Sequence, residues 1–106
     1  MCKPTVIARK GTVSVSQCIN CKMVNIWNQG VLISFSFQQF DAFIDATREL
    51  EFDDYLEQSP DGKDIVVLAT PYPDLSLVFT RPEWFNFFAA LHEASYMQQI
   101  YNMVHH

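Results

Sequence analysis

Residues 31–43, VLISFSFQQFDAF, place a strand directly before a helix and predict how this part of the chain folds. Apolar residues recur along Val31–Phe35 in the pattern of a strand with a buried face. Ser36 and Gln39 then match a capping box, in which the two side chains satisfy backbone amides at the start of a helix. Residues 37–50 carry apolar side chains at helical spacing, with polar side chains opposite. We therefore expect a strand that leads into an amphipathic helix packed on a sheet.

A similar arrangement recurs 44 residues further along the chain. Thr80 and Glu83 repeat the capping box, and Pro82 lies inside the first helical turn, where its missing N–H costs nothing. The apolar positions match in the same register: Ile33 with Leu77, Phe35 with Phe79, Phe40 with Trp84, Phe43 with Phe87 and Ile44 with Phe88. The match is consistent with a duplicated ββα unit, and equally with two units that share the same physical pattern.

Alternation and turn residues predict the remaining strands. They are expected at Thr5–Arg9, Thr12–Ser16, Met23–Trp27, Asp64–Thr70 and Leu75–Phe79. Asn28–Gly30 reads as a hairpin turn with Gly30 in the left-handed conformation. The predicted class is α+β in the order ββββαββα, with two helices packed on an antiparallel sheet.

The length of the chain fits one domain over residues 1–106, because 106 residues support a single core. Within it we expect an N-terminal hairpin with a cysteine turn over 1–22. A first ββα unit with an acidic loop follows over 23–58, and a second ββα unit over 64–106. Phe35, Phe40, Phe43, Ile44, Phe79, Trp84, Phe87, Phe88 and Leu91 are the predicted core.

Charge and hydropathy exclude several classes of function. The formal net charge is −5, and nine of the twelve acidic residues fall between Asp41 and Asp64. An acidic chain without a basic stripe repels phosphate backbones, so no nucleic-acid partner is expected. No apolar run approaches the ~20 residues of a membrane span, so no membrane partner is expected. The cluster of acidic residues is either a solvated surface or a surface that attracts a basic partner.

The three cysteines leave three alternatives open. Cys18 and Cys21 form a C-x-x-C pair between two strands, and the first hairpin would bring Cys2 toward them. The alternatives are structural thiols without metal, a zinc site with Cys2, Cys18 and Cys21 as ligands, and a disulfide or redox pair. A fourth zinc ligand is missing. Because the N-terminus has no apolar signal segment and the number of cysteines is odd, we expect a cytoplasmic protein with reduced thiols.

The layout Cys2, Cys18-x-x-Cys21, strand, short Asn/Gly turn and VLISFSFQQFDAF resembles a small uncharacterised bacterial family, a domain of unknown function found mainly in Bacteroidetes. The resemblance covers roughly residues 2–50. In that family a histidine often follows the cysteine pair, whereas this chain has Asn25 in that region. The resemblance implies a fold and no known activity.

No set of residues in the sequence matches a known catalytic arrangement. The three glycines are scattered, no nucleophile elbow or H-E-x-x-H pair is present, and His92 stands alone as a base. We therefore expect a protein that is not an enzyme and needs no cofactor, with zinc as the one candidate. The expected function is a non-catalytic protein-interaction domain, with a zinc-stabilised structural domain as the alternative.

The last helix has more apolar faces than one sheet can cover. Trp84, Phe87, Phe88 and Leu91 share one face, while the stripe toward the C-terminus is rotated away from it. Either the helix kinks or frays near Ser95, or the second stripe packs on a second copy in a two-fold dimer or on another protein. The candidate interface residues are Phe85, His92, Tyr96, Met97, Ile100, Tyr101 and Val104.

Overall fold

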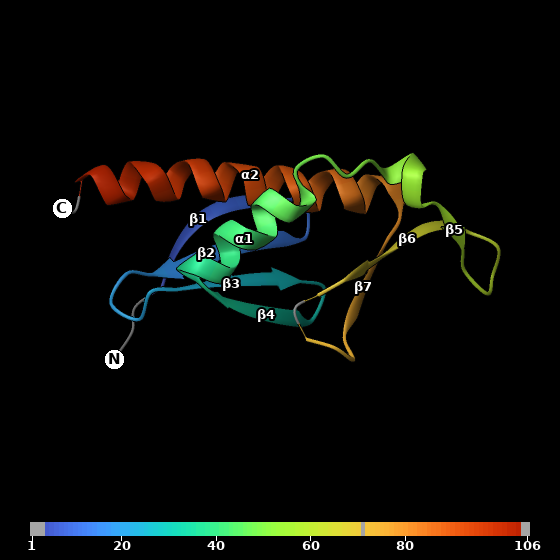
Figure 1. Ribbon diagram of the computed structural model, residues 1–106, viewed down its shortest axis with the longest axis horizontal. Coiled ribbons are helices and arrows are strands. Elements are labelled where there is room, and N and C mark those ends of the chain that lie inside the picture. The colour runs from blue at the N-terminus through green and yellow to red at the C-terminus, as the bar shows by residue number, and fades with distance from the viewer. Residues whose placement is uncertain (1–3, 71, 105–106) are drawn as a thin grey trace. The chain divides into compact units, whose positions relative to one another are not determined.

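The computed structural model describes residues 4–70 and 72–104 (Figure 1). It confirms the α+β class, the antiparallel pairing and the order ββββαββα, with a two-residue strand and a short 3₁₀ helix added after the first helix. The strands form two sheets, of four and three strands, where we expected one sheet carrying both helices. Within each sheet, every strand pairs only with the strand before or after it in the sequence.

The chain folds into two compact units. The first contains the chain up to Arg48 and from Asn86 onward, and the second is Glu49–Phe85. The sequence analysis divided the chain at other positions. Residues 1–22 do not separate from the strands that follow, because the second and third strands are paired along six consecutive positions.

The sheet of the first unit is a four-stranded meander. Its strands are β1 (Thr5–Lys10), β2 (Val13–Cys18), β3 (Met23–Asn28) and β4 (Val31–Ser36). Val15 pairs with Ile26, and Ile26 pairs with Ile33, so one row of β-branched side chains crosses three strands. All three side chains are buried, which identifies the core face of the sheet.

Two left-handed residues form the β3–β4 turn as expected. Gln29 and Gly30 have φ values of 49° and 81°, the signs that a tight hairpin turn requires. In the cysteine turn the left-handed residue is Lys22, with φ of 55°.

Helix α1 (Phe37–Thr47) begins at the predicted cap. The Gln39 N–H donates to the Ser36 hydroxyl at 3.0 Å, and the Ser36 N–H donates to Gln39 Oε1 at 2.9 Å. The backbone N–H of Phe37 also donates to the Lys22 carbonyl at 3.1 Å, which ties the start of α1 to the cysteine turn. On the sheet side of α1, Phe40 and Phe43 pack close to Phe35 of β4, with ring centroids 6.3 and 5.2 Å away.

The second unit contains the smaller sheet. A 3₁₀ helix, η1 (Phe52–Tyr55), and the short strand β5 (Glu57–Gln58) occupy the segment that we expected to be an acidic loop. Strands β6 (Asp64–Ala69) and β7 (Ser76–Phe79) form its hairpin. Phe79 and Phe52 both lie edge-on to Trp84, with ring centroids 6.0 Å apart in each pair. These three rings form the core of the second unit.

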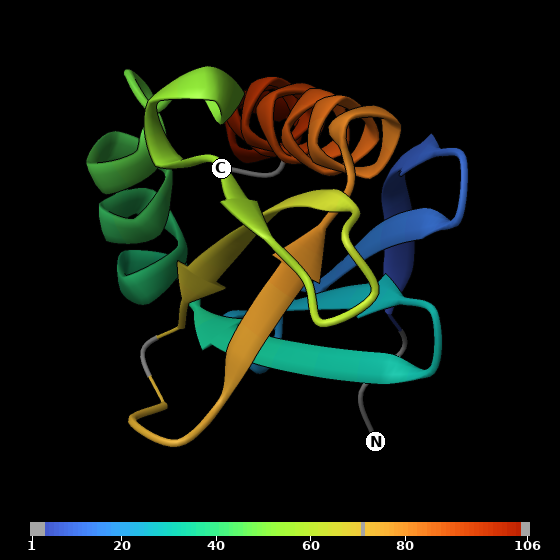
Figure 2. The ribbon, with the colours of Figure 1, turned by 90° about the vertical axis from the view of Figure 1, so that its right-hand side faces the viewer.

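Helix α2 (Arg81–Val104) is one continuous α-helix of 24 residues, so the break near Ser95, one of the two alternatives, does not occur. Its first residues belong to the second unit, and Glu83 Oε1 accepts from the Thr80 N–H at 2.8 Å, as one half of the predicted cap requires. From Asn86 onward α2 belongs to the first unit, where both helices lie on one side of the sheet (Figure 2).

Two contacts hold this part of α2 beside the β1–β2 turn. Lys10 pairs with Glu93 at 3.1 Å. Gly11, at φ of 57°, lies so close that an added Cβ would be 2.7 Å from Asn86 Nδ2. The left-handed conformation favours glycine here, and a larger residue would also displace the Asn86 side chain. All nine predicted core residues are buried, each with 8% or less of its surface exposed.

Removing a ring from this core should cost a large part of the stability. We expect Phe43→Ala to lower the free energy of unfolding by ~3–5 kcal/mol, because it deletes a buried aromatic side chain and leaves a cavity. Chemical denaturation followed by circular dichroism measures this. The control is Gln38→Ala on the exposed face of the same helix, which should unfold at nearly the parent denaturant concentration. Equal midpoints for the two variants would contradict the packing of α1.

Candidate functional site

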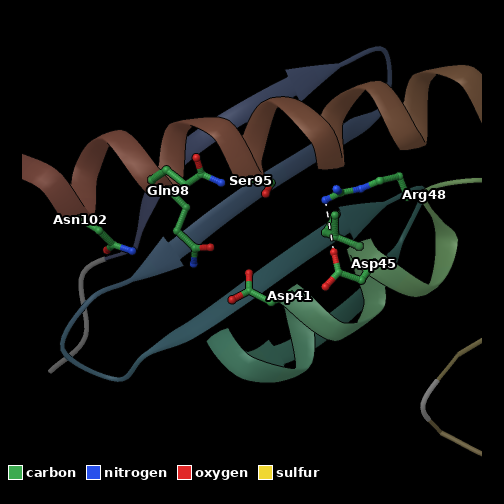
Figure 3. Close-up of a pocket in the computed structure, with 8 residues that line it drawn as sticks. Asp41, Asp45, Arg48, Ser95, Gln98 and Asn102 are labelled. Atoms are coloured by element: carbon green, nitrogen blue, oxygen red, sulfur yellow. Dashed lines mark ion pairs between the residues drawn. The ribbon is translucent and has the colours of Figure 1, made fainter.

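A groove of about 280 Å³ lies between α1 and α2 in the first unit (Figure 3). Residues of α1 line one wall, and a stripe of α2 at i, i+3, i+4 and i+7 spacing lines the other. The lining residues are Asp41, Ile44, Asp45 and Arg48 from α1 and Ser95, Gln98, Gln99 and Asn102 from α2. Apart from Ile44 they are polar, so the groove offers two carboxylates, a guanidinium, a hydroxyl and three amides.

The α1 wall of the groove is acidic. Arg48 pairs with Asp45 at 3.2 Å, but both side chains are more than 60% exposed, so the pair contributes little to stability. Asp41 has no ion-pair partner among the residues that the structure describes. The wall therefore carries a net formal charge of about −1 and an unpaired carboxylate one turn before the pair.

The α2 wall contains a buried amide. Gln98 is only 5% exposed, and its Nε2 has no hydrogen-bond partner within the described part of the chain. A buried donor that lacks an acceptor costs ~1–3 kcal/mol. Gln17 on β2 is also buried and lacks partners for its amide, but it does not line the groove. Gln98 thus supplies the groove with a donor that the fold itself does not use.

The sequence analysis missed this groove. The acidic cluster that includes Asp41 and Asp45 was expected to be either a solvated surface or a surface that attracts a basic partner, and no role was assigned to the polar stripe of α2. The signal was a run of Ser95, Gln98, Gln99 and Asn102 at helical spacing beside an apolar stripe. Polar residues in that position mark either a solvated flank or a polar interhelical site, and only the packing of the two helices distinguishes these.

A second candidate surface is an exposed face of α2 in the first unit. Ala89, His92, Tyr96 and Met103 lie within about 60° of each other around the helix axis. All four are exposed, and Tyr96 and Met103 reach 63% and 75%. None carries a formal charge at neutral pH. We call these four residues the α2 exposed face.

The predicted interface residues divide into two groups. His92 and Tyr96 are on the α2 exposed face, and Phe85, in the second unit, is exposed as well. Met97, Ile100 and Tyr101 are half-buried within the single chain, so the stripe toward the C-terminus is partly covered without a partner. Val104 ends the helix, and its side chain lies outside the described residues.

The cysteines differ from the expectation of reduced thiols. Cys18 is disulfide-bonded, and Cys21 is a free, exposed thiol, so the C-x-x-C pair does not bond to itself. Cys2 lies outside the described residues. A sulfur in a disulfide is not a thiolate ligand, so the predicted zinc set of Cys2, Cys18 and Cys21 is incomplete in this state. Over residues 4–70 and 72–104, no three His, Cys, Asp or Glu side chains group closely enough to hold a metal ion.

In the second unit an arginine joins the start of α2 to the 3₁₀ helix. Arg81 donates to Asp53 at 2.5 Å, and its guanidinium lies 4.6 Å from the ring centroid of Phe52. The hydrogen bond from Arg81 lowers the pKa of the Asp53 carboxyl, and the positive charge acts in the same direction. The residues around this pair also border a hollow of about 270 Å³. The exposed Arg81–Asp53 ion pair and the Phe52 ring beside it suit a structural link between η1 and the start of α2. We call these three residues the arginine clasp.

Comparison of the chain with protein-family models, with curated proteins and with solved structures finds no match. The resemblance to the small bacterial family therefore stays a prediction. Among the described residues, no helix is both long enough and apolar enough to cross a membrane.

The states of the two described cysteines can be tested by alkylation. Without reductant, we expect iodoacetamide to modify Cys21 and to leave Cys18 unmodified, because only Cys21 is a free thiol. Peptide mass mapping before and after reduction measures this, and Cys21→Ser should remove the label from the peptide that contains position 21. Alkylation of Cys18 without reductant would contradict the disulfide.

The arginine clasp predicts a pH dependence. Because the folded pKa of Asp53 is lowered, its ionised form stabilises the fold above the ordinary carboxyl pKa, and this stabilisation is lost as the pH falls through the folded value. An NMR titration should show the lowered pKa in the parent protein and its return toward the ordinary range in Arg81→Gln. Lys63→Gln, which removes a charge elsewhere in the unit, should leave the pKa of Asp53 unchanged.

Proposed function

We propose that this chain is a non-catalytic protein-interaction domain that pairs with a second copy through the α2 exposed face. One observation carries the proposal: four exposed, uncharged residues, two of them long apolar or aromatic side chains, form a continuous face on a chain with a net charge of −5. Aromatic and methionine side chains are enriched at interfaces, while acidic ones are depleted.

Charge favours a second copy on this face. Two copies of an acidic chain repel each other wherever acidic surfaces meet, so self-association needs a surface without acidic residues. The neighbouring acid on α2, Glu93, is already paired with Lys10 of the same chain. The α2 exposed face therefore allows two copies to approach without placing unpaired like charges together.

The spacing of the face also suits two-fold symmetry. Ala89 and Met103 are each seven residues, or two helical turns, from Tyr96. In an antiparallel pair of α2 helices centred on Tyr96, Ala89 of one copy faces Met103 of the other, so a long side chain lies against a small one. The two Tyr96 rings meet at the two-fold axis. A face of about 21 Å is thus self-complementary in shape.

The absence of a catalytic arrangement supports the non-catalytic part of the proposal. His92 is exposed on the α2 face, and its ring lies 6.4 Å from that of Phe88. The groove contains the Ser95 hydroxyl and two carboxylates, but no hydrogen bond joins them within the described residues. A binding role asks only for an exposed surface of suitable chemistry, which the α2 exposed face provides.

The symmetry of the proposed pair permits a charge-rescue test. Ala89→Lys and Met103→Glu should each weaken the dimer at least tenfold, because each places a charge against an apolar side chain. The double variant should recover most of the affinity, because each introduced ammonium then faces the introduced carboxylate of the other copy. Within one helix the two positions are about 21 Å apart, too far to pair. Sedimentation equilibrium over a range of concentrations measures the dissociation constants.

Tyr55→Arg provides the matched control for charge on an exposed ring, because Tyr55 is 52% exposed and belongs to the second unit. It should dimerise like the parent, whereas Tyr96→Arg should be monomeric. A parent protein that remains monomeric at high concentration would overturn self-association, and rescue that fails in the double variant would overturn the antiparallel arrangement.

A further inference from the structure

We infer that the groove between α1 and α2 binds a basic side chain presented by a peptide backbone. Asp41 receives the cationic group, and Gln98 donates to a carbonyl of the peptide. The ligand class follows from two independent features of the groove: an acidic wall without enough positive charge, and a buried donor without an acceptor.

The unpartnered amide of Gln98 indicates that the ligand presents a hydrogen-bond acceptor. Gln98 is anchored on the buried side of α2, and Figure 3 shows it among the side chains that line the groove. Its Nε2 lacks an acceptor among the described residues. A peptide carbonyl is a neutral acceptor and would satisfy this group without adding negative charge beside Asp41 and Asp45. An anionic acceptor such as a phosphate would have to approach both carboxylates, so it is disfavoured.

The acidic α1 wall indicates that the ligand also carries a positive charge. Asp41 and Asp45 lie one helical turn apart on α1, and Figure 3 shows both along the same wall. Arg48 neutralises Asp45 at 3.2 Å, which leaves Asp41 to pair with a charge from outside. A guanidinium or ammonium group supplies that charge, and a guanidinium can bridge to the second carboxylate as well.

The volume limits how much of the ligand enters. About 280 Å³ is at the lower end of ligand pockets, and it accommodates one long side chain with its adjacent peptide group. Ile44, which is 2% exposed, is the apolar residue of the lining and offers contact for the methylene groups of such a side chain. The groove therefore fits a single arginine or lysine of an extended segment.

This inference does not depend on self-association. The groove and the α2 exposed face are lined by different residues of the first unit, so a monomeric protein could still bind a peptide. The titration below is therefore repeated in Tyr96→Arg. If the dimer is not found but the peptide binds, only the proposed self-association is overturned. If the dimer forms but the peptide does not bind, only the inference about the groove is overturned.

The test is an NMR titration of the full chain with an Ala-Arg-Ala peptide blocked at both ends. We expect saturable shifts of the Gln98 side-chain amide and of the Asp41 backbone amide, with a dissociation constant in the millimolar range that is normal for so small a ligand. The same peptide with glutamine in place of arginine should bind at least tenfold more weakly. Methylguanidinium alone tests the other source of the cation and should shift Asp41 but leave the Gln98 amide nearly unchanged.

Two pairs of variants separate a built site from general charge attraction. Asp41→Asn should weaken peptide binding at least tenfold, whereas Asp74→Asn, which changes the net charge equally at an exposed position of the second unit, should not. Gln98→Met keeps the length of the side chain and removes the amide, so it should weaken the peptide but not methylguanidinium. Gln38→Met, at an exposed position of α1 outside the groove lining, is its control.

The inference is overturned if the arginine peptide causes no saturable shift at Gln98. It is overturned equally if Asp41→Asn and Asp74→Asn lose the same affinity, because binding would then follow net charge alone. Equal binding of the peptide and of methylguanidinium would assign the groove to small cations rather than to peptides.

Discussion

The capping interaction at Ser36 is the constraint on which the arrangement of the first unit depends. Ser36 is the last paired residue of β4, opposite Met23, and at the same time the N-cap of α1. The Ser36 hydroxyl accepts from the Gln39 N–H, and the Gln39 side chain accepts from the Ser36 N–H. Without these bonds both backbone donors would lack an acceptor where the sheet ends. The chain therefore passes from strand to helix without a loop. Phe40 and Phe43 then reach the ring of Phe35 within two turns.

The position of α1 in turn creates the groove. Because Phe43, Ile44 and Thr47 face the core, Asp41 and Asp45 must lie on the flank that borders α2. The glycine at position 11 and the Lys10–Glu93 ion pair hold the other wall in place beside the β1–β2 turn. The groove is a consequence of two helices that share one sheet, and its chemistry comes from residues that the core does not use.

Both candidate surfaces follow from the same property of α2. The sheet covers only part of the circumference of α2. The remaining faces of the helix therefore take no part in the core. One flank is polar and borders α1, and the next is uncharged and exposed. Gln98 lies within the buried stripe of α2, where an apolar residue would cost less. The unpartnered amide of Gln98 is the observation on which the proposed binding at this flank rests.

Much of the fold could be predicted from the sequence because its signals are local. Alternation along strands, the capping boxes at Ser36 and Thr80 and the turn at Gly30 act between residues a few positions apart, so the element order and the nine core residues were predictable. The separation into two sheets was not, because strand pairing joins segments that the sequence does not label as partners. The sequence also left open whether α2 breaks near Ser95, because periodicity reports which faces are apolar but not which of them the fold covers. The half-burial of Met97 and Ile100, the disulfide at Cys18 and the presence of Asp41 and Gln98 in one groove depend on distances between segments apart in the chain. Only tertiary packing decides those distances.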